Sequence, residues 1–121
     1  MGALTIEVQL HRFIREAGAH PWPSRTWLYS SEMDVYVRCT KRILDRERTT
    51  LDLASISVPE ELQGKGIFSR LVNFAVAVNP REALFMESVI NPILTKWCIK
   101  HGWLPAGDPA RPTGYYLLME A

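Results

Sequence analysis

The chain has 121 residues and 47% of them are hydrophobic, which is enough for one domain with a single packed core. Its formal net charge of +1 argues against a protein that binds nucleic acid through its overall charge, so no nucleic-acid partner is expected. No apolar run is long enough to span a membrane, and the N-terminus lacks the basic-then-apolar order of a signal peptide, so we expect a cytoplasmic protein without a membrane partner.

The first patterned stretch, from Leu4 to Ala17, fits two kinds of element. Alternating apolar residues would suit a strand, at Leu4, Ile6, Val8 and Leu10. A longer set repeats along one side of a helix and comprises Ile6, Leu10, Phe13, Ile14 and Ala17. Because the helical pattern is the longer one and Gly18 then supplies a stop, we predict a helix here.

An extended loop is predicted next, because Pro21 and Pro23 flank Trp22 and both prolines disfavour regular structure. A short strand follows over Trp27–Tyr29. Both tryptophans are interpreted as caps on the core.

Two antiparallel strands are predicted over Asp34–Leu44 and Thr49–Val58, joined by a charged reversal at 45–48. Apolar and polar residues alternate along the first of them, as expected where one sheet face is buried. The basic side chains of this hairpin are interpreted mainly as a solvated face and turn; they are Arg38, Lys41, Arg42, Arg46 and Arg48. The alternative is a docking patch for an acidic partner.

The most informative stretch runs from Leu51 to Val72, where a strand feeds a glycine turn and the turn opens a helix. Pro59 ends the strand, Gly64 and Gly66 shape the turn, and the helix is predicted to continue to Val78. Such a turn leaves backbone N–H groups unpaired at the positive end of the helix dipole, which favours a phosphate or a diphosphate. The glycine spacing fits neither a P-loop nor the dinucleotide-binding pattern.

The run Ala83–Val89 is almost entirely apolar, which is typical of a strand buried on both faces and parallel to its neighbour. A second helix is predicted from Asn91, its cap, to Gly102. The chain closes with two short strands, Trp103–Leu104 and Tyr115–Met119. Because the last strand is strongly apolar, we expect it to be an edge that pairs with a second copy in a homodimer.

The cysteines and histidines indicate no metal site. Cys39 and Cys98 lack ligand spacing and are expected to remain reduced thiols. The histidines, His11, His20 and His101, are scattered along the chain, so no metal ion is expected. His101 is expected to cap the end of the second helix.

Two segments resemble the signatures of the GNAT superfamily of acyl-CoA-dependent N-acetyltransferases. The first, Gln63-x-x-Gly66-x-Phe68, is similar to the family's Gln/Arg-x-x-Gly-x-Gly/Ala, with Phe68 in place of a small last residue. The second runs from Asn91 to Trp103 and is similar to Asn-x-x-Ala-x-x-x-Tyr-x-x-x-Gly-Phe. The two segments also occur in the family's order, with a buried strand between them.

The resemblance implies a single domain over 1–121, with an abbreviated N-terminal region at 1–32 and an acyl-CoA-binding core at 33–121. The implied fold is mixed α/β, an α+β sandwich whose sheet has two splayed central strands. Acetyl-CoA is the implied cofactor, and its acetyl group would pass directly to an amine on a protein or on a small molecule. The residues implied to bind it are Ile56, Ser57, Val58, Gln63, Gly64, Lys65, Gly66, Ile67, Phe68, Ser69 and Asn91.

Three residues are candidates for proton transfer. The family's general base falls at Asp52; the alternative is a polar residue on the outward face of a half-exposed strand. Glu87 is a second candidate base, because a carboxylate among apolar neighbours should have a raised pKa; the alternative is a structural hydrogen bond. Cys98 stands where the family's tyrosine protonates the departing thiolate, although packing, Tyr115, Tyr116 or solvent are alternatives.

A second hypothesis is a non-catalytic interaction module on the same scaffold that binds a partner protein. Phe68, the missing tyrosine and the abbreviated N-terminal region favour it. Trp22 and Trp27 would line the acceptor pocket of an enzyme, or contact the partner of a module.

Overall fold

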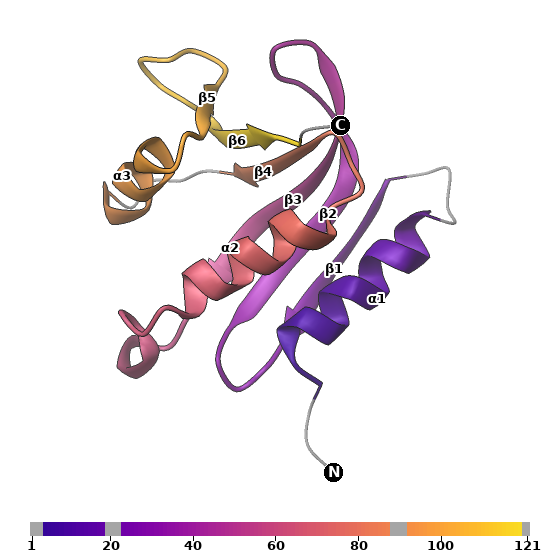
Figure 1. Ribbon diagram of the computed structural model, residues 1–121, viewed down its shortest axis with the longest axis vertical. Helices are drawn as coiled ribbons and strands as arrows, with labels where there is room; N and C mark the ends of the chain where they lie inside the picture. The colour runs from indigo at the N-terminus through magenta and orange to yellow at the C-terminus, as the bar shows by residue number, and fades with distance from the viewer. Residues whose placement is uncertain (1–3, 19–22, 88–91, 120–121) are drawn as a thin grey trace.

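Six strands form one mixed sheet in the computed structural model, which describes residues 4–18, 23–87 and 92–119 (Figure 1). In sheet order β1-β2-β3-β4-β6-β5, the strands are Ser24–Tyr29, Asp34–Ile43, Glu47–Ser57, Ala83–Glu87, Gly114–Leu118 and Leu104–Ala106. The helices are α1 Ile6–Gly18, α2 Ile67–Val78 and α3 Pro92–Lys100, with a 3-10 turn, η1, at Glu60–Leu62. None of these helices has the length and apolar character needed to cross a bilayer. The fold is therefore of the mixed α+β class.

Helix α1 confirms the longer of the two N-terminal patterns. All five of its predicted inward residues are buried: Ile6, Leu10, Phe13, Ile14 and Ala17. Leu4 and Val8, which only the strand pattern would bury, are 44% and 47% exposed. The helical period prevails because it gives the chain a continuous apolar stripe to pack on the sheet.

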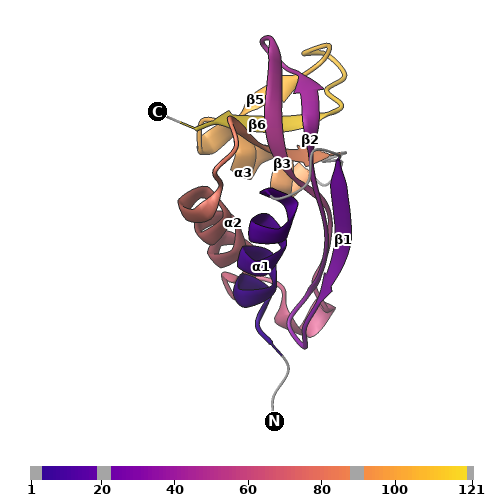
Figure 2. The same ribbon diagram turned by 90° about the vertical axis from the view of Figure 1, so that its right-hand side faces the viewer.

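Helices α1 and α2 cover one face of β1, β2 and β3, and the core lies between the two layers (Figure 2). Leu10 of α1, Leu71 of α2, and Val35, Val37 and Leu51 of the sheet have no exposed surface. Burying each aliphatic side chain of this kind stabilises the fold by about 1.5–3 kcal/mol. The opposite face of β1 and β2 carries none of the described helices.

Strand β4 is parallel to β3 and buried, as the apolar run predicted. Residues 83–86 are at most 3% exposed. Helix α2 supplies the crossover that a parallel pair requires. The predicted end of this strand at Val89 and the predicted cap Asn91 lie outside the described residues.

Strands β3 and β4 pair only over Thr50–Leu53 and Ala83–Met86. Strand β3 then continues to Ser57 beside β2 alone. The register with β2 shifts at the same level, so Ala54 has no partner residue. Because a bulge bends a strand, this irregularity turns β3 away from its parallel neighbour.

The last strand is not an edge. Strand β6 pairs with β4 on one side and with β5 on the other. The prediction of an apolar C-terminal edge available to a second copy is therefore wrong, because β5 covers that side. Among the described strands, β1 and β5 form the edges.

Candidate functional site

The glycine turn before α2 has the backbone conformation that its sequence requires. Gly64 and Gly66 both have φ of +78°, in the left-handed region that other residues disfavour. Gly66 directly precedes Ile67, the first helical residue. A Cβ at either glycine would meet no atom within 4 Å, so backbone conformation and not crowding selects glycine here.

A run of backbone N–H groups in this turn has no acceptor among the described residues. The N–H of Arg70 donates to the Gly66 carbonyl at 3.0 Å and begins the hydrogen bonding of α2. From Gly64 to Ser69, no described residue accepts a hydrogen bond from the backbone N–H groups. These donors lie at the positive end of the helix dipole, so the site is suited to an anion.

Gln63 closes the loop that carries these donors. Its side-chain amide donates from Nε2 to the Val58 carbonyl at 3.1 Å, and its backbone N–H donates to the Glu60 carbonyl at 3.2 Å. The side chain is thus engaged within the loop, and its role is to shape the turn.

A cavity of about 480 Å³ opens beside the turn, between the end of β3 and helices α2 and α3. It is lined by Ile56, Val58, Leu62, Gln63, Gly64, Gly66, Ile67, Phe68, Ser69, Leu94 and Trp97. Most of the predicted cofactor-binding residues are therefore brought together. Ser57 and Lys65 are exposed outside this lining, and Asn91 lies outside the described residues.

Phe68 forms part of the cavity wall. Its ring meets that of Trp97 edge-on, with centroids 5.2 Å apart and planes at 80°. Trp97 also stacks on His101 at 4.1 Å, and Nδ1 of His101 lies 2.8 Å from the Trp97 carbonyl oxygen, so His101 caps α3 as predicted. Sequence analysis did not name Trp97 as a site residue, because no local pattern distinguishes it from its buried neighbour Cys98.

Asp52 is fully buried, so the alternative interpretation, a polar residue on a half-exposed strand, is wrong. Arg42 donates to its Oδ2 from Nε and Nη2 at 2.9 and 2.8 Å, and Thr50 Oγ1 donates to its Oδ1 at 2.6 Å. Nε of Arg38 lies 3.4 Å from Oδ2 as a further ion pair. The Arg42 guanidinium lies 4.3 Å from the Phe85 ring centre and helps to cover the carboxylate. Both oxygens are therefore engaged.

Glu87, at the end of β4, closes the same network. Its Oε1 lies 2.7 Å from Nη2 of Arg38 and 3.4 Å from Nη2 of Arg42. The side chain is 35% exposed, so the prediction of a carboxylate among apolar neighbours was wrong. Burial opposes the charge of Arg38, but Glu87 and Asp52 outweigh this effect and raise the pKa of Arg38.

Cys98 lies in the core and not among the residues of the cavity wall. It is fully buried, and burial raises the pKa of its thiol to about 11. Its neighbour Trp97 takes the cavity-facing position. Tyr115 and Tyr116 are also buried. The packing alternative therefore describes Cys98, and no described phenol replaces it in the wall.

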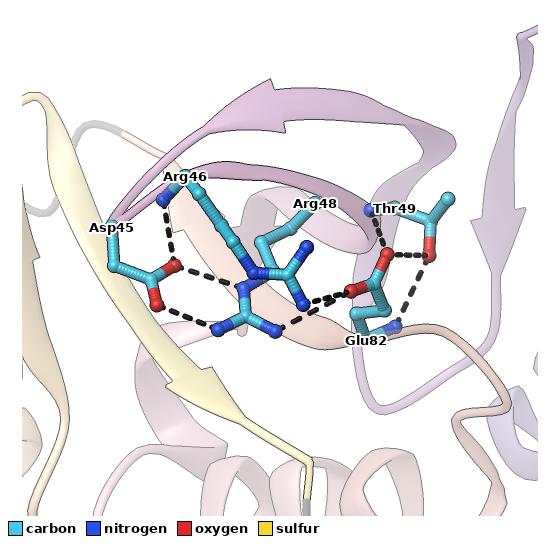
Figure 3. Close-up of polar contacts among 5 residues, drawn as sticks. All are labelled: Asp45, Arg46, Arg48, Thr49 and Glu82. Carbon is cyan, nitrogen blue, oxygen red and sulfur yellow. Dashed lines mark hydrogen bonds and ion pairs between the residues drawn. The ribbon is translucent and has the colours of Figure 1, made fainter.

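The hairpin end carries a second charge network (Figure 3). Arg48 donates to Asp45 from Nε and Nη2 at 2.9 and 2.6 Å, and its Nη1 lies 3.3 Å from Oε2 of Glu82. Nη2 of Arg46 lies 3.4 Å from the same oxygen, and the Thr49 N–H donates to Oε1 at 3.3 Å. Arg48 is only 17% exposed, so the prediction of a solvated basic turn was wrong for it, as it was for the two paired arginines of β2.

Comparisons with known proteins show a similar fold in one solved structure but do not assign the chain to a family. No protein-family model and no curated protein matches the chain. The fold is similar to a chain in a solved structure described as "The crystal structure of KacTA-DNA complex", with a TM-score of 0.59 over 93% of this chain and 80% of that chain. The two sequences are 12% identical, so the likeness concerns the fold alone. That complex contains DNA, and it lends no support to the expectation that nucleic acid is absent among the partners.

Proposed function

We propose that this protein is an acetyl-CoA-dependent N-acetyltransferase with a GNAT-like fold. The observation that carries the proposal is the end of β3–β4 pairing at Leu53, beside a cavity lined by a run of N–H groups that have no acceptor among the described residues. A donor with a diphosphate and a long amide arm matches both features. The N–H groups bind the diphosphate, and the unpaired side of β3 binds the amides as an added strand would.

The donor arm lies along Ile56 to Val58 in this proposal. The Val58 carbonyl is taken by Gln63, whereas no described residue accepts a hydrogen bond from the Val58 N–H. That N–H holds the thioester oxygen as negative charge develops on it during attack by the amine. The acceptor is an amine of a protein or of a small molecule.

Glu87 receives the proton of the attacking amine through a water molecule. It stands at the last described position of β4, where the two strands part, and its side chain is partly exposed. Asp52 is enclosed with both oxygens engaged, so it positions the arginines that hold Glu87. Solvent protonates the departing thiolate, since Cys98 lies in the core.

A non-catalytic interaction module is the second candidate. The burial of Cys98 favours it, because the position where the family carries its proton donor holds a thiol that does not line the cavity. Such a module binds a partner protein and leaves any bound thioester intact.

Calorimetry with acetyl-CoA and with coenzyme A tests the donor site, with ATP as a phosphate-bearing control that lacks the amide arm. We expect saturable binding of both coenzyme A forms and weaker binding of ATP. Absence of a signal at millimolar acetyl-CoA would contradict the proposal.

Release of free thiol in the presence of an amine acceptor tests turnover. Glu87→Gln should lower the rate by about 10²-fold or more, as expected for loss of a general base. Glu82→Gln, the same change in the hairpin network, is the matched control and should leave the rate unchanged. Donor binding without thiol release would favour the interaction module.

A further inference from the structure

No helix of the described residues covers the sheet face opposite α1 and α2 across β1 and β2, and we call it the open face (Figure 2). Alternate residues of these strands point to it, and the register pairs Arg25 with Arg38 and Trp27 with Tyr36. A row of cations and a row of aromatic rings are therefore neighbours on one surface. The donor cavity and the glycine turn make no use of this face.

Trp27, Tyr29 and Tyr36 form an aromatic group on the open face. The Trp27 ring lies 6.1 Å from that of Tyr29 with planes at 16°, and 5.2 Å from that of Tyr36. Trp27 is 43% exposed and Tyr29 is 59% exposed. Large rings normally bury most of their surface, so this group offers π-faces on which a planar ligand can stack.

A basic cavity of about 340 Å³ adjoins the aromatic group near the start of β1. Its lining consists of Pro23, Ser24, Arg25, Arg38, Thr40, Lys41 and Arg42. Every charged residue in this lining is a cation. Hydroxyl groups from Ser24 and Thr40 add further hydrogen-bonding capacity for an anion.

Part of this positive charge is not neutralised. Asp52 and Glu87 pair with the two arginines of β2. No carboxylate of the described residues lies within ion-pair distance of Arg25 or Lys41. The cavity therefore carries a local positive surplus, although the whole chain has a net charge of only +1.

We propose that this open face binds a single strand of nucleic acid, with phosphates at the basic cavity and bases stacked on the aromatic group. Single strands are bound in this way because every base has a π-face and every linkage carries a negative charge. An acidic peptide would satisfy the cations and leave the exposed rings without a stacking partner. Alternate positions of a strand are about 6.6 Å apart, so the cavity and the rings lie within reach of adjoining nucleotides.

Fluorescence anisotropy with labelled oligothymidylate and oligouridylate of about 12 nucleotides tests this proposal at low salt. We expect saturable binding of at least one of them. Two unpaired cations predict a slope of about −1.4 for the logarithm of affinity against the logarithm of salt concentration. None of these measurements uses acetyl-CoA, so the result is independent of the proposed acetyltransferase activity.

Matched variants separate the two parts of the surface. The double change Trp27→Ala with Tyr29→Ala should weaken binding at least about fivefold, the loss expected from one base–ring stack. Trp27→Phe keeps a ring and should lose less. Arg25→Gln with Lys41→Gln should weaken binding at low salt and flatten the salt slope. Lys96→Gln, which changes an exposed cation on α3 away from both surfaces, is the control and should change neither.

Four results would overturn the proposal. The first is no saturable binding of either oligonucleotide at low salt. The second is binding that survives loss of the rings. The third is equal affinity for a polyglutamate peptide, which would identify an acidic protein as the partner. The fourth is self-association that Trp27→Ala abolishes, which would show that a second copy covers this face.

Discussion

The two ends of β3 contrast within one strand. Over Thr50–Leu53 the strand has a neighbour on both sides, and the charged groups around it are closed into pairs, from Arg48 with Glu82 to Arg42 with Asp52. Over residues 54–57 it has β2 alone, and the loop that follows leads to N–H groups without described partners.

This contrast shows how one strand serves both stability and binding. Where neighbouring strands cover it, a polar group must find a partner inside the protein, because an unpaired buried group costs about 1–3 kcal/mol. Where the strands part, water or a ligand can satisfy the polar groups, and the fold leaves them available. Each of the following changes tests whether the two ends differ as described.

The largest effect on stability is expected from Asp52→Asn, in the part of β3 that has a neighbouring strand on both sides. The change removes the charge that pairs with Arg38 and Arg42, and it should lower the free energy of unfolding by about 2–4 kcal/mol, with the partial exposure of both arginines limiting the loss. Urea denaturation measures it. Asp45→Asn, the same change at the exposed hairpin end, should have a clearly smaller effect. Equal effects would show that the burial of Asp52 has no energetic consequence.

Phe68→Ala should lower stability without lowering donor affinity at the cavity beside the end of β3. Loss of the ring contact with Trp97 should cost about 1–3 kcal/mol, less than for a fully buried phenylalanine. The backbone N–H of residue 68 remains, so acetyl-CoA affinity should stay within about threefold, a change below 1 kcal/mol. Phe74→Ala, on the same helix but outside the cavity wall, is the control for stability. A large loss of affinity only in Phe68→Ala would mean that the ring itself binds the donor.

Gly66→Ala should affect binding more than stability. Alanine at a φ of +78° is strained by about 1 kcal/mol, and relief of that strain would move the N–H groups of the turn. We expect acetyl-CoA affinity measured by calorimetry to fall about tenfold. Gly102→Ala imposes a similar strain at φ of +81° after α3 and should leave affinity unchanged. If both variants lose affinity equally, the turn has no special part in binding.

The smallest effect is expected from acid at the hairpin end. The hydrogen bond from Arg48 lowers the pKa of Asp45, and the backbone hydrogen bond from Thr49 lowers that of Glu82. Since the folded-state pKa of both groups is depressed, their stabilisation is complete above about pH 5.5 and is lost as the pH falls through the folded-state pKa values. Thermal melts of the protein and of Glu82→Gln should therefore converge as the pH is lowered below 4. A constant difference at all pH values would contradict this linkage.

The local pattern of apolar residues in the sequence predicted most of the helices and strands. The α1 stripe was found because all five of its apolar residues belong to one helical period, and α2 and β4 were found for similarly local reasons. Strand β1 begins at Ser24, ahead of the predicted Trp27, because pairing with β2 and not its own pattern sets its length.

Ion pairs and strand pairings between residues far apart in the sequence could not be predicted from the sequence alone. Arg38 and Arg42 looked solvated because their partners Asp52 and Glu87 stand on other strands. Strand β6 looked like an edge because sequence order does not show that β5 covers it. In α3, only the packed structure shows that Trp97 lines the cavity and that its neighbour Cys98 lies in the core.

The hydrogen bond from the Gln63 side-chain amide to the Val58 carbonyl affects how fast a ligand can bind. Ordering a free loop loses on the order of 1–2 kcal/mol of conformational entropy per residue, but here that loss occurs when the protein folds. The loop therefore has its binding conformation before an anion arrives. The association rate constant should depend on how often the two molecules collide and not on a slow rearrangement of the backbone.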